Sequence, residues 1–176
     1  MPVIIAPPAT DEYAEFHRGY IAAVAGEPDA LALLERQHRS IAAFGTLSVE
    51  QAAHRYADGK WTVREVVGHL ADAERVVSYR LLCVARGERG KLPGFDEQGY
   101  AAHSNADRRH LAELVEELTV VRDGTLALVR SLDAEVLTQR GNVNDWTLSV
   151  RALSFIIAGH FQHHVNVLRD RYGIAV

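Results

Sequence analysis

Apolar residues recur at helical spacing along almost the whole chain, and the alternation typical of β-strands is absent. Glycine, proline and charged clusters separate the helical segments. The pattern predicts helices over residues 11–24, 29–44, 62–86 and 107–132, a short helical turn over 47–51, and a last helix that includes 156–171. The apolar faces of the four long helices predict an all-α fold, namely a four-helix bundle around one core.

Polar residues mark the starts of two long helices. Thr62 and Glu65 form a capping box, in which the hydroxyl and the carboxylate satisfy free amide groups, and Ser149 can cap the last helix. Residues 87–104 are rich in glycine and charge and are too long for a tight helix hairpin. We expect this segment to form the mouth of a site, and we expect a polar loop over 141–145.

The last helix carries three histidines within five residues of an otherwise apolar run. At about 100° per residue, His160 and His164 lie about 40° apart on one face, which is the i, i+4 spacing that lets two imidazoles bind one metal ion. His163 lies about 60° to the other side, so spacing alone leaves it an alternative to His164. Core histidines held by hydrogen bonds are the simpler interpretation. A His-Glu-x-x-His metalloprotease needs a glutamate directly after the first histidine, and here that position is Phe161, so this class of protease is excluded.

A further histidine, His69, lies at the edge of the apolar stripe of the helix over 62–86. Its approach resembles that of His160, because Trp61-Thr62-Val63-Arg64 leads to Gly68-His69, while Trp146-Thr147 and Val150-Arg151 lead to Gly159-His160. A glycine before each histidine would let another part of the backbone approach closely. The similarity favours one site shared by the two helices.

Composition narrows the classes of partner. The net charge is −4, and the 24% of charged residues are mixed in sign, which argues against nucleic acid or an anionic membrane as a partner. At 176 residues the chain suits one well-buried core. A single cysteine, Cys83, excludes an intramolecular disulfide framework and fits a reducing compartment. With no long apolar run, we expect a cytoplasmic protein.

Three stretches of sequence then combine into a known pattern. They are Gly59–Arg75 (GKWTVREVVGHLADAER), Leu92–Glu97 (LPGFDE), and Val150–His164 with its histidines. Together they resemble the DinB/YfiT-like superfamily. The resemblance covers about Leu33 to Tyr172 and implies a four-helix bundle with long crossover connections. We expect this bundle domain over residues 29–176, with residues 1–28 packing on it as an N-terminal extension and first helix. The resemblance also implies a divalent metal ion held by three histidines, which fall on His69, His160 and His164.

Such a site is open. Three neutral imidazoles leave a fourth position on a zinc or nickel ion for water or a thiol, as in catalytic sites. The resembling family includes S-transferases that use bacillithiol-type or mycothiol-type thiols, and members described as metal-dependent hydrolases. We expect transfer of a low-molecular-weight thiol to a small-molecule electrophile. Hydrolysis by metal-activated water and a non-catalytic, stress-related binding module are the alternatives, and a homodimer is a possible assembly.

Other residues are candidates for supporting roles. Asp72 and Glu65 lie about one turn to either side of His69, where a carboxylate can orient a ligand or move a proton, and Asp72 is the favoured catalytic group. Glu65 has its capping role as the alternative. Gln37 and His163 are candidates for contacts just outside the ligands.

Candidates for substrate contacts lie further from the histidines. Phe95 and Tyr100 offer flat apolar surfaces and Asp96 offers acceptors, a mixture that suits a small-molecule pocket. Arg80 can hold an anionic tail of the substrate, with a surface-directed arginine as the simpler alternative. The histidines in polar surroundings are expected at the surface: His17, His54, His103 and His110.

Overall fold

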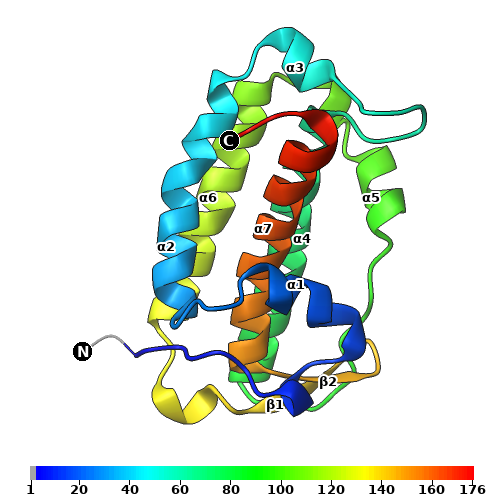
Figure 1. The fold of residues 1–176 in the computed structure, drawn as a ribbon. Helices are drawn as coiled ribbons and strands as arrows, with labels where there is room; N and C mark the ends of the chain where they lie inside the picture. The colour runs from blue at the N-terminus through cyan, green and yellow to red at the C-terminus, as the bar shows by residue number, and fades with distance from the viewer. Residues whose placement is uncertain (1–2) are drawn as a thin grey trace.

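Four long helices form the body of the protein in a computed structural model that describes residues 3–176 (Figure 1). They are α2 (Ala30–Ile41), α4 (Val63–Ala85), α6 (Leu111–Arg130) and α7 (Val150–Tyr172). Helix α4 packs against α6 and α7, and α2 closes the ring by packing against the same two helices. The expected all-α fold, a four-helix bundle, is confirmed.

The predicted caps are present at the two helices that carry the histidine motifs. The Thr62 hydroxyl accepts a hydrogen bond from the Glu65 amide at 3.2 Å, and the Glu65 carboxylate accepts one from the Thr62 amide at 2.7 Å. The Ser149 hydroxyl accepts a hydrogen bond from the Ala152 amide at 3.0 Å. These caps satisfy amides that the first turn of each helix leaves free, and so they fix where α4 and α7 begin.

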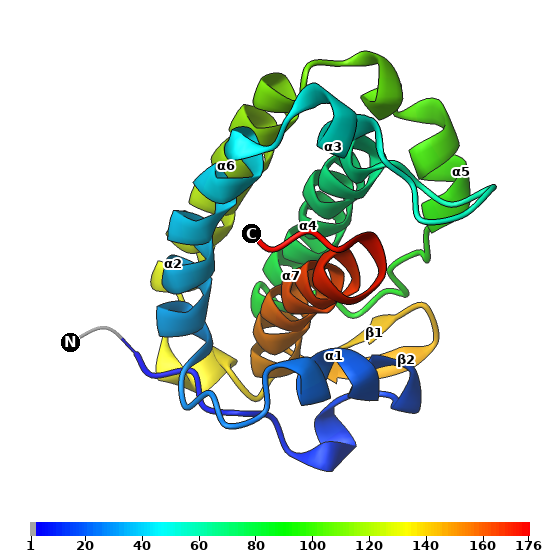
Figure 2. The ribbon, with the colours of Figure 1, turned by 45° about the horizontal axis from the view of Figure 1, so that its top comes forward.

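Short elements fill the connections between the long helices. They are α1 (Arg18–Ala23), α3 (Val49–Ala53), α5 (Glu97–His103), and single turns of 3-10 helix at Thr10–Glu12, Glu15–His17, Ala42–Thr46, Ala106–Arg108 and Ala134–Val136. Helix α5 lies within the long connection between α4 and α6, where only irregular structure was expected. It stands beside the bundle, in contact with α4 (Figure 2).

The predicted helix over residues 11–24 is wrong in its first half. Two separate turns of 3-10 helix precede the six residues of α1. Tertiary contacts hold this segment: Arg140 donates to the Asp11 carbonyl oxygen at 2.9 Å, and the buried Glu12 carboxylate accepts hydrogen bonds from Arg151 and from Ser149. These contacts with the start of α7 and the chain before it override the local helical pattern.

A β-hairpin replaces the polar loop expected over 141–145. Strands β1 (Arg140–Val143) and β2 (Trp146–Ser149) pair antiparallel, with Val143 opposite Trp146. Asn144 and Asp145 form the turn, with φ of 51° and 68°. Positive φ at both central residues is what a two-residue hairpin turn of type I′ requires. Four-residue strands are too short to give a clear alternating pattern, which is why the sequence did not reveal them.

The hairpin also ties two connections together at one end of the bundle. The Leu92 amide donates to the Asn142 carbonyl at 2.9 Å, and the Asn144 amide donates to the Leu92 carbonyl at 2.8 Å. Helix α1 and the hairpin lie together at this end, while α3 lies at the other (Figures 1 and 2). The long α4–α6 connection is therefore anchored rather than free.

A buried ion pair crosses the core of the bundle. The Arg122 guanidinium, fully buried on α6, donates to both carboxylate oxygens of Glu74 on α4 at 2.7 and 2.8 Å. It also donates to the Leu34 carbonyl oxygen on α2 at 3.3 Å and lies 5.0 Å from the ring centre of Phe161 on α7. One side chain thus contacts the other three long helices.

Within residues 3–176, no helix combines the length and the apolar character needed to cross a membrane.

Candidate metal centre

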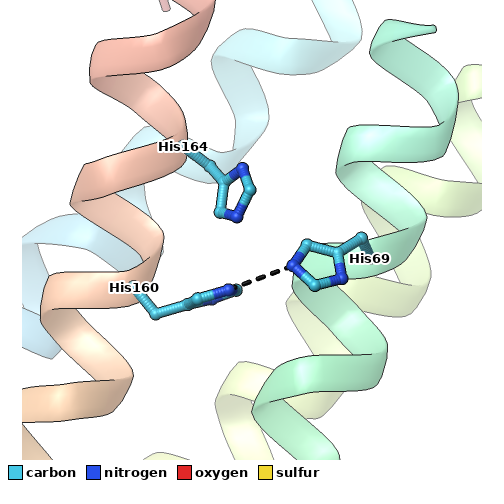
Figure 3. A group of neighbouring side chains, drawn as sticks. All are labelled: His69, His160 and His164. Atoms are coloured by element: carbon cyan, nitrogen blue, oxygen red, sulfur yellow. Dashed lines mark hydrogen bonds between the residues drawn. The ribbon is translucent and has the colours of Figure 1, made fainter. Parts of the chain in front are cut away.

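Three histidines meet between α4 and α7. His69 projects from α4 and His160 and His164 project from α7, with their rings directed toward one another (Figure 3). The Nε2 atoms of His69 and His160 are 3.0 Å apart, and one ring nitrogen from each of the three residues lies within 4.8 Å of the others. The i, i+4 pair on one helix and the single histidine on the facing helix therefore converge on one point.

The surroundings keep these imidazoles neutral. Burial, with a smaller effect of neighbouring histidines, lowers the pKa of His160 to about 3 and that of His69 to about 4. Burial also lowers the pKa of His164 well below its ordinary value. A neutral imidazole is the form that binds a metal ion, because the protonated ring has no free lone pair.

The three residues fit a divalent metal ion. Buried histidines that serve only the core normally find hydrogen-bond partners, yet Nδ1 of His164 is buried and has none within residues 3–176. Three neutral nitrogen donors directed toward one point form the donor set of an open zinc-type site. The cluster thus matches a metal-dependent enzyme better than a set of hydrogen-bonded core histidines.

The glycines before two of the histidines bring neighbouring segments close, as the sequence predicts. A Cβ atom on Gly159 would lie 2.1 Å from the carbonyl oxygen of Tyr20 at the start of the chain. A Cβ atom on Gly68 would lie 2.8 Å from the Cβ atom of Ala106, in the connection before α6. Both distances are far below van der Waals contact, so only glycine allows these approaches beside the histidine cluster.

Two cavities reach the histidine cluster from different sides. The first, of about 240 Å³, has His160 in its wall, and the second, of about 190 Å³, has His164 in its wall. Trp61 lies in the wall of the second cavity, and its ring centre is 4.7 Å from that of His69. The His160 and His164 rings are 4.6 Å apart, so each cavity has one of two adjacent cluster histidines in its wall.

Two of the predicted substrate contacts line the first cavity. Arg80 and Phe95 lie in its wall together with His160. The Arg80 guanidinium lies 5.5 Å from the Phe95 ring centre and donates a hydrogen bond to the Pro93 carbonyl at 2.7 Å. The anchored α4–α6 connection thus forms part of the cavity wall next to the histidines.

The structure does not bring Asp72, Asp96 or Tyr100 into either cavity. These three residues line a separate shallow hollow beside α5. Burial raises the pKa of Asp72, whose carboxylate lies 3.3 Å from the Arg75 guanidinium. Asp96 caps α5 by accepting a hydrogen bond from the Gln98 amide at 3.1 Å.

The remaining candidates lie outside the cluster. Glu65 serves in the capping box of α4. Gln37 donates to the Ala158 carbonyl at 2.9 Å, so its amide joins α2 to α7 next to the buried Arg122. His163 turns toward the outside, where its ring centre is 5.6 Å from that of Tyr20. Of the two histidines that spacing left open, only His164 belongs to the cluster.

His17 was expected at the surface, and this expectation is wrong. His17 is only 6% exposed and lines the first cavity. Its ring is covered by that of the adjacent Phe16 and by that of Trp146 in the hairpin. His54, His103 and His110 are exposed as expected. The sequence also missed the other cavity residues of the first segment, Phe16 and Tyr20. The aromatic spacing Phe16-His17-x-x-Tyr20 was the available signal.

Comparison with known proteins identifies the family of this chain. The chain is 25% identical over 122 residues to an Oceanobacillus iheyensis protein named "Putative metal-dependent hydrolase OB0413", covering 68% of this chain and 69% of the relative. Its fold is similar to that of YfiT from Bacillus subtilis, with a TM-score of 0.68, 22% identity, and coverage of 83% of this chain and 87% of that one. YfiT is described as a probable metal-dependent hydrolase with an unusual four-helix bundle topology. Residues 32–168 match the DinB superfamily, and the chain belongs to this family.

Proposed function

We propose that this protein is a metal-dependent enzyme that transfers a low-molecular-weight thiol to a small electrophile. The observation that carries the proposal is a cluster of three neutral histidines, two of which lie in the walls of separate cavities. A bound zinc or nickel ion would be held by His69, His160 and His164, and it would supply the Lewis acidity that lowers the pKa of a thiol or of water. A cytoplasmic location, where thiols stay reduced, is part of this proposal.

The second cavity favours transfer over hydrolysis. Hydrolysis needs room for one organic substrate and a water molecule, whereas transfer brings two organic molecules to the same point. The His160 side offers aromatic walls and the Arg80 guanidinium, and the His164 side offers Lys60 with Tyr56 and Tyr172. In the transfer, the thiol sulfur forms a bond to carbon, the leaving group departs with its electron pair, and the thiol proton passes to solvent.

The chain's own residues have defined tasks in this proposal. The three histidines stay neutral and hold their rings toward one point. Arg80 binds an anionic part of a substrate through a charge-assisted hydrogen bond. The apolar walls exclude water from the reacting atoms, which favours the thiol over water as the nucleophile.

Hydrolysis is the second candidate, because both similar proteins carry the words metal-dependent hydrolase. In this case, one substrate would occupy the His160 cavity and water would enter from the His164 side. A binding protein without turnover is the third candidate. These alternatives predict different results in one set of measurements.

The first test is metal content, measured on protein purified without a histidine tag so that column nickel does not enter the site. We expect the parent chain to bind about one divalent ion, and His69→Ala, His160→Ala and His164→Ala each to lose it, because two imidazoles hold such an ion far more weakly than three. His110→Ala removes an exposed histidine and is the matched control. Full metal content in all three cluster variants would overturn the assignment of the site.

The second test is conjugation of monobromobimane with cysteine, glutathione and bacillithiol, each with and without a chelator. We expect a rate above background for at least one thiol, which the chelator and the His160→Ala substitution abolish. A metal-dependent release of product from esters or amides, without any thiol conjugation, would instead support the hydrolase. Metal binding without turnover of either kind would support the binding protein.

A further inference from the structure

Part of the wall of the first cavity comes from a segment that the family match does not include. The match covers residues 32–168, whereas Phe16, His17 and Tyr20 precede it. The Tyr20 ring lies 5.3 Å from the His160 ring, and the tight approach at Gly159 fixes the backbone of this segment on α7. The start of the chain is therefore seated directly beside the histidine cluster.

His17 places an imidazole in the wall of the first cavity. The residue is only 6% exposed, and the nearest partner for its ring is the Ala14 backbone. Burial, followed by the nearby charge of Arg80, lowers the pKa of His17 to about 4, so the ring is neutral at pH 7. A neutral imidazole in the wall of the cavity can donate a hydrogen bond to a ligand there.

Arg80 provides a second polar group in the wall of the same cavity. Within residues 3–176, its one hydrogen bond is the contact with the Pro93 carbonyl, which leaves most of its five N–H donors available. An imidazole and a guanidinium that line one cavity suit a ligand with a carboxylate or a similar anion.

The rest of the cavity is aromatic. The Phe16 and Trp146 rings are stacked, with centres 4.9 Å apart and planes at 20°, and Phe95 lines the cavity near Arg80. Flat rings select flat ligands, because stacked and edge contacts need planar partners. Glu97 also lines this cavity, and burial raises the pKa of its carboxyl group.

We propose that segment 15–20 makes this protein selective for planar aromatic compounds that carry an anionic group, with His17 and Arg80 binding the anion and Phe16 and Trp146 contacting the ring. This inference names the electrophilic substrate class of the proposed function and rests on that function for turnover. Binding itself needs only the cavity, so the two can be tested separately.

Tryptophan fluorescence provides a direct measurement. The chain has two tryptophans, Trp61 in the second cavity and Trp146 in the first, so the Trp61→Phe variant reports from the first cavity alone. The probe is p-nitrobenzoate, an unreactive aromatic anion whose nitro group quenches indole. We expect the quenching to saturate with p-nitrobenzoate. Nitrobenzene, which lacks the anionic group, should bind with a higher Kd. Benzoate should compete more strongly than cyclohexanecarboxylate, whose ring is not planar.

Variants then separate the contributions, all in the Trp61→Phe background. We expect Arg80→Met to raise the Kd for p-nitrobenzoate by about tenfold or more, because it removes a charge-assisted hydrogen bond. We expect His17→Phe to raise it by about three- to tenfold, because it removes a neutral hydrogen bond. Phe16→Ala should raise it as well, and this exposed residue can be replaced without loss of the fold. Tyr56→Ala, in the second cavity, is the matched control and should leave the Kd unchanged.

Unchanged affinity in both His17→Phe and Phe16→Ala would overturn the inference, as would quenching that does not saturate. The outcome for the proposed function is read separately, from thiol transfer to chlorodinitrobenzene and, for comparison, to iodoacetamide. Binding as expected without any thiol transfer would contradict the proposed function and leave the inference standing. Thiol transfer that does not depend on segment 15–20 would support the proposed function and contradict the inference.

Discussion

Arg122 is the side chain whose loss should damage the fold most. It is fully buried, and its removal leaves the Glu74 carboxylate buried without its partner. We predict that Arg122→Met lowers the free energy of unfolding by about 3–5 kcal/mol, measured by urea denaturation. The double variant with Glu74→Leu should recover most of that loss, because it removes the unpaired charge as well. A single variant as stable as the parent would contradict this account.

His17 should make the stability depend on pH. Its pKa is lowered from 6.5 to about 4 in the folded chain, so between these values the unfolded chain binds a proton that the folded chain does not. The folded state therefore loses stability as the pH falls from 6.5 toward 4, by up to about 1.4 kcal/mol per pH unit. Above pH 6.5 the effect is absent.

The measurement compares the parent with His17→Phe by urea denaturation at pH 7 and pH 5. All other ionisable groups are the same in both proteins, so their contributions cancel in the difference. We expect the parent to lose about 1–2 kcal/mol more than the variant over this range. A difference that does not change with pH would mean that His17 is solvated in the folded chain.

Single residues were predictable from sequence where their contacts are local or repeat a known spacing. The i, i+4 pair of His160 and His164 is a property of one helix, and Glu65 caps the helix three residues after Thr62. The burial of His17 depends on Trp146, far along the chain, and a local pattern does not carry that information. The burial of Arg122 on α6 was likewise not predictable, because it depends on pairing with Glu74 on another helix.

At the scale of elements, two helical glycines should respond in opposite ways to alanine. Gly159→Ala would place a methyl group 2.1 Å from the Tyr20 carbonyl oxygen, so we predict a loss of at least about 1–3 kcal/mol in the free energy of unfolding. A methyl group on Gly124 of α6 would meet no atom within 4 Å, so Gly124→Ala should gain about 0.5–1 kcal/mol from helix propensity.

Chemical denaturation of the two variants and the parent checks this pair. A stabilised Gly159→Ala protein would show that α1 moves freely away from α7. A destabilised Gly124→Ala protein would point instead to a strained backbone at that position of α6.

The long elements follow from their sequence, and the short ones do not. Helices α4 and α7 have caps, apolar stripes and more than six turns, so several independent signals agree. The hairpin has four residues in each strand. It is held by main-chain hydrogen bonds to Leu92 and by contacts with α4 and α7. Helix α5 has seven residues and depends on its contact with α4. Such elements are fixed by tertiary contacts that a local reading of the chain does not contain.

For the whole molecule, metal binding should raise thermal stability. An ion at 100 times its Kd adds about 2.7 kcal/mol to the free energy of unfolding. In a chain of this size that corresponds to about 5–10 °C in Tm. We predict a fall of this size when a chelator is added, measured by circular dichroism. The Tm of His69→Ala should not respond to the chelator, and an equal fall in that variant would place the ion elsewhere.

The two parts of the site have separate origins along the chain. The histidines belong to α4 and α7, within the stretch shared across the family, while Phe16, His17 and Tyr20 come from the first twenty residues. A change at the start of the chain can therefore alter what the cavity accepts while the three histidines stay the same. Exchange of this short segment between relatives is thus a way to vary the cavity around one histidine cluster.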